Sequence, residues 1–152
     1  PGSRITGYGV VESDGTRLAF VACGVIKTTA NYPFSVRINE IFDGLNEVIR
    51  LHDPAMAAIE EVFLASNPNT AIKLGQARGA AVVAAMQNGL SVTDYSARKI
   101  KQAVAGYGHA EKGQVQQMVR ILLNLRQAPS SDAADALAVA ICHANMPRFS
   151  AL

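Results

Sequence analysis

The stretch Ser131-Asp132-Ala133-Ala134-Asp135-Ala136-Leu137-Ala138 has the pattern of an amphipathic helix and carries two aspartates three residues apart. Residues i and i+3 are neighbours on a helix surface, so the carboxylates of Asp132 and Asp135 point the same way. Two such charges repel each other unless something positive lies between them. The helix dipole offsets part of this repulsion, and a divalent metal ion would offset far more. The motif alone therefore leaves two interpretations, an acidic helix start and a metal site.

A third acid, Glu60, lies in a short apolar run at residues 56–64. The length of this run and the proline-containing turns on either side predict a buried strand. Side chains alternate along a strand, so Glu60 and Glu61 must face opposite sides. A carboxylate on a covered face needs a partner, which is either a Lys or Arg side chain or a shared cation. We favour a carboxylate cluster with Asp132 and Asp135 that binds Mg²⁺ or Mn²⁺, because hard cations take oxygen ligands.

The composition indicates a single domain of ordinary globular type. The chain has 152 residues, of which 49% are hydrophobic, and this is enough for a proper core within residues 1–152. No apolar run approaches the roughly 20 residues of a membrane span, and no signal-peptide pattern leads the chain. Cys23 and Cys142 are far apart in apolar sequence, which is typical of reduced thiols in a cytoplasmic protein. We therefore expect a cytoplasmic protein without membrane contact.

The formal net charge of +2 hides an uneven distribution along the chain. Residues 62–131 hold eight Lys and Arg side chains against only Asp94 and Glu111. A basic surface neutralises backbone phosphates, and acids beside it can hold metal at the bond to be cut. This combination is what a phosphodiester-cleaving enzyme needs, although a solvated basic face without any ligand would give the same count.

Turn residues and hydrophobic periodicity predict the order of the elements. We expect β-rich runs at 4–11 and 17–26 joined by an Asp-Gly turn, a helix at 34–52, the strand that carries Glu60, a long Ala-rich helix from Asn67-Pro68 to about 88, a strand at 90–94, and helices at 96–104, 111–125 and from 131. This order predicts an α/β fold with a mixed sheet that is antiparallel at its first hairpin and flanked by helices.

Several stretches together resemble the RuvC family of Holliday junction resolvases, within the RNase H-like (retroviral integrase) superfamily. They are residues 1–10 (PGSRITGYGV), 58–63 (AIEEVF), 73–79 (KLGQARG), 101–104 (KQAV), 110–115 (AEKGQV) and 132–138 (DAADALA). A single one of these motifs is a moderate signal. Six of them in the family's order and near its spacing make a strong resemblance that spans the chain.

The resemblance implies a mixed five-stranded RNase H-like sheet and a homodimeric endonuclease. Such an enzyme cuts four-way DNA junctions by paired symmetric nicks during recombination and repair, in the bacterial cytoplasm and beside a branch-migration helicase complex. It also implies two Mg²⁺ or Mn²⁺ ions held by four carboxylates, of which Glu60, Asp132 and Asp135 match three. The family places the fourth, an aspartate, directly before Pro-Gly-Ser-Arg. The chain begins at Pro1, so we expect the real polypeptide to carry that aspartate and most of the first strand upstream.

The resemblance further implies which residues touch DNA. Lys101 matches a lysine near the scissile phosphate and is expected to take part in catalysis, while Lys112 matches one along the DNA path, with a generic surface lysine as the alternative. Phe63 is expected to stack on unpaired bases at the junction centre, with a core aromatic as the alternative. Phosphate contacts are expected from Lys73, Arg78 and Arg98. The Ala-rich face of the helix at 68–87 is the expected dimer surface.

Two further functions are compatible with parts of the sequence. One is a DNA-binding module that keeps the basic surface and has lost catalysis. The other is an actin-like phosphotransferase, because Pro1-Gly2-Ser3-Arg4 could pass for a phosphate-binding turn. That second class needs another domain to close over nucleotide, and 152 residues leave no room for one. Nucleotide binding without DNA affinity would distinguish it.

Overall fold

A computed structural model describes residues 1–63 and 67–147 of the chain. The elements in these ranges are β1 (Ile5–Ser13), β2 (Leu18–Lys27), α1 (Phe34–His52), β3 (Met56–Glu60), α2 (Pro68–Gln87), β4 (Ser91–Tyr95), α3 (Ala97–Ala105), α4 (Lys112–Leu122) and α5 (Ser131–Ala144). Each predicted element is present, with bounds that differ mostly by one or two residues.

The strands form two hydrogen-bonded pairs. β1 and β2 make an antiparallel hairpin, and β3 and β4 run parallel with Glu60 opposite Tyr95. The hairpin turn is built as the Asp-Gly pair predicts, because Asp14 Oδ1 accepts the amides of Thr16 and Arg17 at 2.8 and 2.7 Å and Gly15 takes a positive φ of 96°. In the described residues no backbone pairing joins the two pairs, so the mixed sheet is small: four strands in two pairs stand where the resemblance implied five strands.

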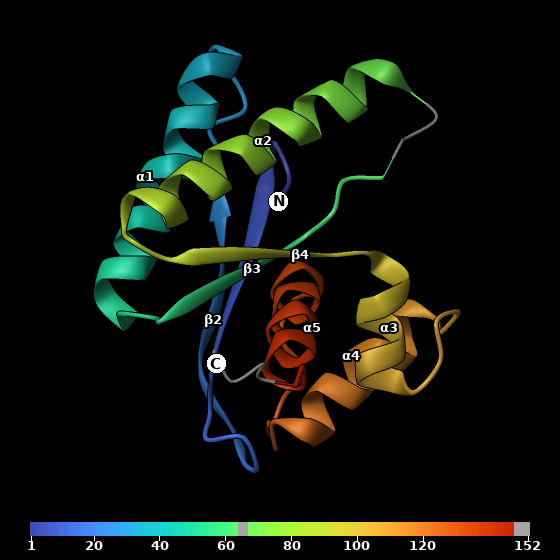
Figure 1. Ribbon diagram of the computed structural model, residues 1–152. Helices are drawn as coiled ribbons and strands as arrows, with labels where there is room; N and C mark the ends of the chain where they lie inside the picture. The colour runs from blue at the N-terminus through green and yellow to red at the C-terminus, as the bar shows by residue number, and fades with distance from the viewer. Residues whose placement is uncertain (64–66, 148–152) are drawn as a thin grey trace.

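Helices cover the strands in two layers (Figure 1). α1 and α2 pack against each other and lie on one side, while α3, α4 and α5 lie on the other. The main core lies under α5, where Val119, Leu137 and Ile141 are fully buried. Because α5 contacts β1, β2 and β3, it is the element that ties both strand pairs together.

The approach of α5 to β1 depends on two glycines. A Cβ atom at Gly7 would overlap the backbone carbonyl of Asp132, and a Cβ at Gly9 would lie 2.8 Å from the backbone nitrogen of Leu137. Side chains at these positions would hold the two backbones apart. The glycines of β1 therefore fix the distance between the strand and the first turn of α5.

Helix starts follow the capping residues in the sequence, and one helix end does not follow the prediction. Asn67, which directly precedes Pro68, caps α2 because its side chain accepts a hydrogen bond from the backbone amide of Asn69 at 3.0 Å. Ser96 caps α3 by accepting a hydrogen bond from the backbone amide of Lys99 at 3.2 Å. The predicted helix at 111–125 ends earlier, at Leu122. The reason is Asn124, whose φ of 53° is left-handed and ends the α-helical hydrogen-bond ladder.

Candidate active site

Glu60 sits at the carboxyl end of β3 and is half-buried, whereas its neighbour Glu61 is exposed. This confirms that the two side chains face different environments. Burial raises the pKa of Glu60 above its ordinary value, and the negative charge of Asp135 adds to the rise. The positive charges of Lys101 and Lys112 act in the opposite direction. Glu60 therefore lies within charge-interaction range of one predicted acid and two predicted lysines.

Asp132 and Asp135 lie in the first two turns of α5 and are half-buried. Ser130 caps the helix by accepting the amide of Ala133 at 3.4 Å, so the serine supplies the cap and the aspartates remain available to other partners. Asp135 Oδ2 lies 3.3 Å from Nζ of Lys112, the first residue of α4. The acidic-helix-start interpretation accounts for Ser130, and it does not account for the charge interaction of Asp135 with Glu60.

The backbone nitrogen of Pro1 lies among these acids. Glu60, Asp132 and Asp135, the three predicted ligands, all lie within charge-interaction range of this single nitrogen atom. Any residue joined to that nitrogen in a longer polypeptide would enter the carboxylate cluster.

Three residues that sequence reasoning missed hold the turn at residues 1–3 in place. The buried Thr6 hydroxyl donates to the carbonyl of Gly2 at 2.9 Å. Both Thr28 Oγ1 and Arg37 Nη2 donate to the carbonyl of Ser3 at 2.8 Å. The partners of Ser3 are 25 and 34 residues away in the sequence, so no local spacing could have indicated them.

The remaining predicted DNA-contacting residues lie around this cluster with different partners. Arg78 forms an ion pair with Asp94 of β4, and its charge is also felt at Pro1. Lys73 Nζ lies 5.8 Å from the centre of the Phe34 ring. Phe63 is 68% exposed three residues beyond Glu60, and Arg98 is exposed on α3. The structure thus links Glu60, Asp132, Asp135, Lys101 and Lys112 through charge interactions, and it places Lys73 and Arg98 in other surroundings.

The donor chemistry of the cluster suits a hard cation, because all three predicted ligands are carboxylates. Across residues 1–63 and 67–147, however, no three His, Cys, Asp or Glu side chains are arranged closely enough to enclose a metal ion. Asp135 is instead accompanied by the ammonium group of Lys112. The residues present fit a divalent ion by chemistry, and the ligand shell that they form is open.

The fold also bears on membrane contact. Among the helices that the structure describes, none is long and apolar enough to cross a bilayer.

Carboxylates at a strand end and at the start of a helix packed across that strand, in a mixed sheet flanked by helices, define a nuclease of the RNase H-like class. A sequence model described as crossover junction endodeoxyribonuclease RuvC matches residues 1–143. The chain belongs to this RuvC family, and it is a crossover junction endodeoxyribonuclease. The family, fold class and enzyme class predicted from the sequence are confirmed.

Individual relatives agree with this assignment. A protein of Geobacter sulfurreducens named crossover junction endodeoxyribonuclease RuvC is 56% identical over 145 residues, which cover 95% of this chain and 88% of the relative. A protein of the same name from Acinetobacter baumannii is 55% identical over 146 residues, covering 95% and 80%. The solved structure of Thermus thermophilus RuvC matches with a TM-score of 0.86 at 39% identity, over 95% of this chain and 90% of that chain. T. thermophilus RuvC in complex with a Holliday junction substrate matches with a TM-score of 0.89 at 40% identity, over 95% and 88%.

Proposed function

We propose that this chain, as a single nuclease domain, binds four-way DNA junctions and resolves them by paired symmetric nicks. The observation that carries the proposal is that the charges of Glu60, Asp132 and Asp135 all act at the backbone nitrogen of Pro1, while Lys101 and Lys112 act on the charge of Glu60. The substrate is supported by the T. thermophilus relative, which was solved with a Holliday junction. Acids that can hold metal beside lysines that can meet phosphate are suited to phosphodiester hydrolysis.

Glu60, Asp132 and Asp135 are the residues that would hold Mg²⁺ or Mn²⁺, and the open ligand shell leaves room for the family's fourth aspartate on the Pro1 side. Two such ions in place would activate water and stabilise the leaving 3′-oxygen. Lys101 would meet the charge of the scissile phosphate. Lys112 would leave its ion pair with Asp135 and contact a phosphate of the DNA. Breaking this ion pair costs little free energy, because both side chains are largely exposed.

The test is cleavage of a synthetic mobile four-way junction by the full polypeptide with Mg²⁺. Nicks of equal frequency at symmetry-related positions in opposite strands support the proposal. Tight junction binding without cleavage would instead support the DNA-binding module that has lost catalysis. Nucleotide binding with no affinity for DNA would support the actin-like phosphotransferase.

Phe63 is proposed to stack on an unpaired base at the junction centre. Its 68% exposure supports this role over a core position, since an aromatic ring in the core would be covered. We expect Phe63→Leu to weaken junction binding roughly tenfold, in line with the contribution of one base–aromatic stack. The measurement is a junction titration at fixed salt, with exposed Leu51→Ala of α1 as the control. Equal affinity of Phe63→Leu and the wild type would remove Phe63 from the proposed interface.

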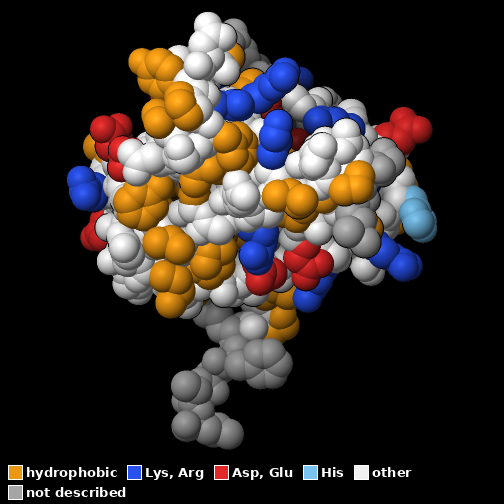
Figure 2. Space-filling view, turned by 90° about the horizontal axis from the view of Figure 1, so that it is seen from above, with side chains coloured by type: hydrophobic (Ala, Val, Ile, Leu, Met, Phe, Trp, Pro, Cys, Tyr) orange, Lys and Arg blue, Asp and Glu red, His pale blue; other side chains and the backbone are white. Residues whose placement is uncertain are grey.

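The Ala-rich face of α2, predicted as the dimer surface, is wrong for that role, because its alanines are buried within the chain, where Ala77 and Ala80 pack with Ile41 of α1. We propose instead that the chain forms a homodimer through the opposite, exposed face of α2. The exposed stripe of this helix consists of Ile72, Gly75, Gly79, Val83 and Met86, and a Cβ at either glycine would meet open space. Figure 2 looks down on the layer of α1 and α2 and shows hydrophobic side chains spread over this face. Small and apolar residues along one helix face permit close packing against a second copy.

We expect Val83→Lys to convert the dimer to monomers, because it places a charge in the middle of the apolar stripe. The oligomeric state is measured by sedimentation equilibrium, together with junction affinity, which should fall with dimerisation. Ile121→Lys is the matched control, since Ile121 is an exposed aliphatic residue on α4, away from α2. A Val83→Lys protein that still sediments as a dimer would show that α2 is not the interface.

The family resemblance also supports a place in the bacterial cytoplasm, beside a branch-migration helicase complex. Co-sedimentation of the chain with such a helicase on a four-way junction, compared with each alone, tests this partner.

A further inference from the structure

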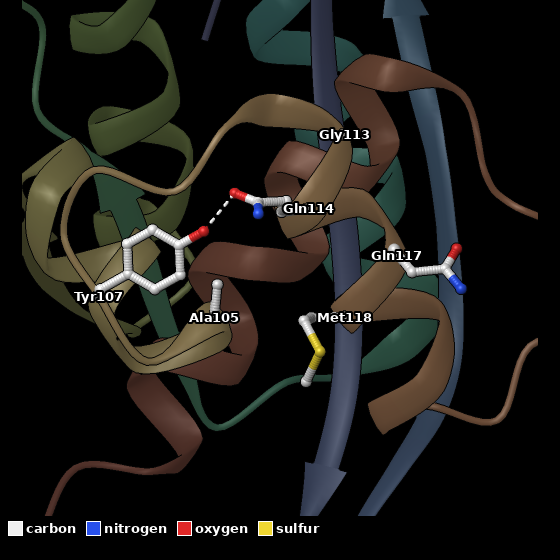
Figure 3. Close-up of a pocket in the computed structure, with 6 residues that line it drawn as sticks. All are labelled: Ala105, Tyr107, Gly113, Gln114, Gln117 and Met118. Atoms are coloured by element: carbon white, nitrogen blue, oxygen red, sulfur yellow. Dashed lines mark hydrogen bonds between the residues drawn. The ribbon is translucent and has the colours of Figure 1, made fainter.

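An open pocket of about 360 Å³ lies between the end of α3 and the first half of α4 (Figure 3). It is lined by Ala105, Tyr107, Gly113, Gln114, Gln117 and Met118. None of these side chains carries a charge, and the size falls within the usual range of ligand pockets. Neither the proposed metal ligands nor the proposed phosphate contacts line it.

Two lining residues of the pocket are close in sequence to lysines of the candidate active site. Ala105 lies one helical turn after Lys101 on the same face of α3. Gly113 directly follows Lys112, whose Nζ is 3.3 Å from Asp135 Oδ2. Both lysines act on the charge of Glu60, so α3 and α4 carry residues of the candidate site as well as the lining of the pocket.

The lining offers a flat aromatic surface and fixed polar groups. The Tyr107 ring is 47% exposed, and its hydroxyl donates to Gln114 Oε1 at 2.5 Å. The same oxygen accepts the amide of Glu111 at 2.9 Å, so the phenol is held by an anchored partner. Figure 3 shows Tyr107, Gln114 and Met118 around the pocket, with the Gln117 carboxamide at its rim pointing away from Tyr107. The Gln117 side chain forms no hydrogen bond with any part of the chain that the structure describes, so its carboxamide is available to a ligand.

We propose that this pocket receives an unpaired nucleobase of the substrate DNA, next to the phosphate that is cut. The inference rests on the proposed function and adds a second base contact, separate from Phe63. The Tyr107 ring would stack on the base, because every base presents a π-face to an aromatic side chain. A change of side-chain rotamer at Gln117 would bring the donor and acceptor atoms of its carboxamide to the edge of a base that is no longer paired. A neutral, planar ligand also suits a lining without charge.

The test places 2-aminopurine singly at each position flanking the branch point and follows its fluorescence when the full polypeptide binds. Stacking on Tyr107 should quench one position, and Tyr107→Leu should abolish that quenching and weaken junction binding roughly tenfold. Tyr107→Phe keeps the ring and should keep the quenching, which separates stacking from loss of the hydrogen bond to Gln114. Tyr32→Leu, at an exposed tyrosine before α1, is the matched control and should behave as wild type.

Two outcomes distinguish this inference from the proposed function. In the first outcome, the wild type binds and cuts junctions, and the 2-aminopurine fluorescence at every position is the same with Tyr107→Leu as with the wild type. The pocket then takes no base, and only this inference is wrong. If the wild type neither binds nor cuts junctions, the proposed function fails and the inference fails with it. Circular dichroism of Tyr107→Leu and Tyr107→Phe shows whether both variants are folded before either comparison is made.

Discussion

Asp135→Asn is expected to lower the rate of junction cleavage about a hundredfold or more while leaving junction affinity within a few fold of the wild type. The substitution keeps the shape of the side chain and removes one negative charge from the carboxylate cluster. Stabilisation of transition-state charge by metal amounts to several kcal/mol, and each 1.36 kcal/mol changes a rate tenfold. Losing one carboxylate donor therefore suffices for an effect of this size.

Affinity should survive because phosphate contacts, rather than metal ligands, supply most of the binding free energy of DNA. The Asp135→Asn change would also release Lys112 from its ion pair, and this leaves a further positive charge free to meet phosphate. The free energy of unfolding should change little, since exposed ion pairs contribute about 0–1 kcal/mol. A folded, junction-binding and inactive protein is the expected combination.

The experiment compares nicking and binding of the same junction by the wild type, Asp135→Asn and Asp43→Asn. Asp43 is the matched control, because it lies exposed on α1, accepts a hydrogen bond from Asn39 and is not part of the proposed site. Cleavage by Asp135→Asn at the wild-type rate would exclude Asp135 from the metal site. Loss of binding together with cleavage would instead indicate that the acid maintains the DNA-binding surface.

Local signals in the sequence were sufficient to predict the elements. Pro33 and the apolar spacing predicted α1 with its observed bounds, and Asn67-Pro68 predicted the first residue of α2. The two acids of α5 and the alternation around Glu60 led to the prediction that these carboxylates share a site, which stays a prediction. Each of these inferences depends on residues within a few positions of one another, where backbone geometry alone decides which side chains are neighbours.

Contacts across the chain were not predictable in the same way. Thr28 and Arg37 donate hydrogen bonds to the carbonyl of Ser3, and these bonds depend on how β2 and α1 are placed beside the turn at residues 1–3. The pairing of Arg78 with Asp94 and the pocket around Tyr107 likewise arise only when separate helices and strands pack. A pattern of residue types within one element carries no information about these placements.

Gly7 is the position where such a long-range contact should have the largest effect on the fold. In the sequence it is one of several glycines in a β-rich run, and in the structure its Cα faces the carbonyl of Asp132 at the start of α5. A methyl group there meets backbone, which cannot rotate away as a side chain can. We expect Gly7→Ala to lower the free energy of unfolding by about 1–3 kcal/mol, the usual cost of overpacking, with a larger loss for Gly7→Val.

Cleavage should fall further than stability alone explains. α5 can accommodate the methyl group only by moving away from β1, and this movement carries Asp132 away from Glu60, which sits on a different strand. Urea denaturation gives the free energy of unfolding, and junction cleavage is measured at a temperature where the variant remains folded by circular dichroism. A folded Gly7→Ala protein with strongly reduced nicking and retained junction binding is the expected result.

Gly113→Ala serves as the control for stability, because Gly113 lies in α4 where a Cβ meets nothing within 4 Å. Alanine at an open helical position should leave stability unchanged or raise it by roughly 0.5–1 kcal/mol. Gly7→Ala is expected to lower the free energy of unfolding, and Gly113→Ala is expected to leave it unchanged or raise it. This difference separates steric overlap from a general effect of replacing glycine. If Gly7→Ala were as stable and as active as the wild type, the close contact of β1 with α5 would not be what positions Asp132.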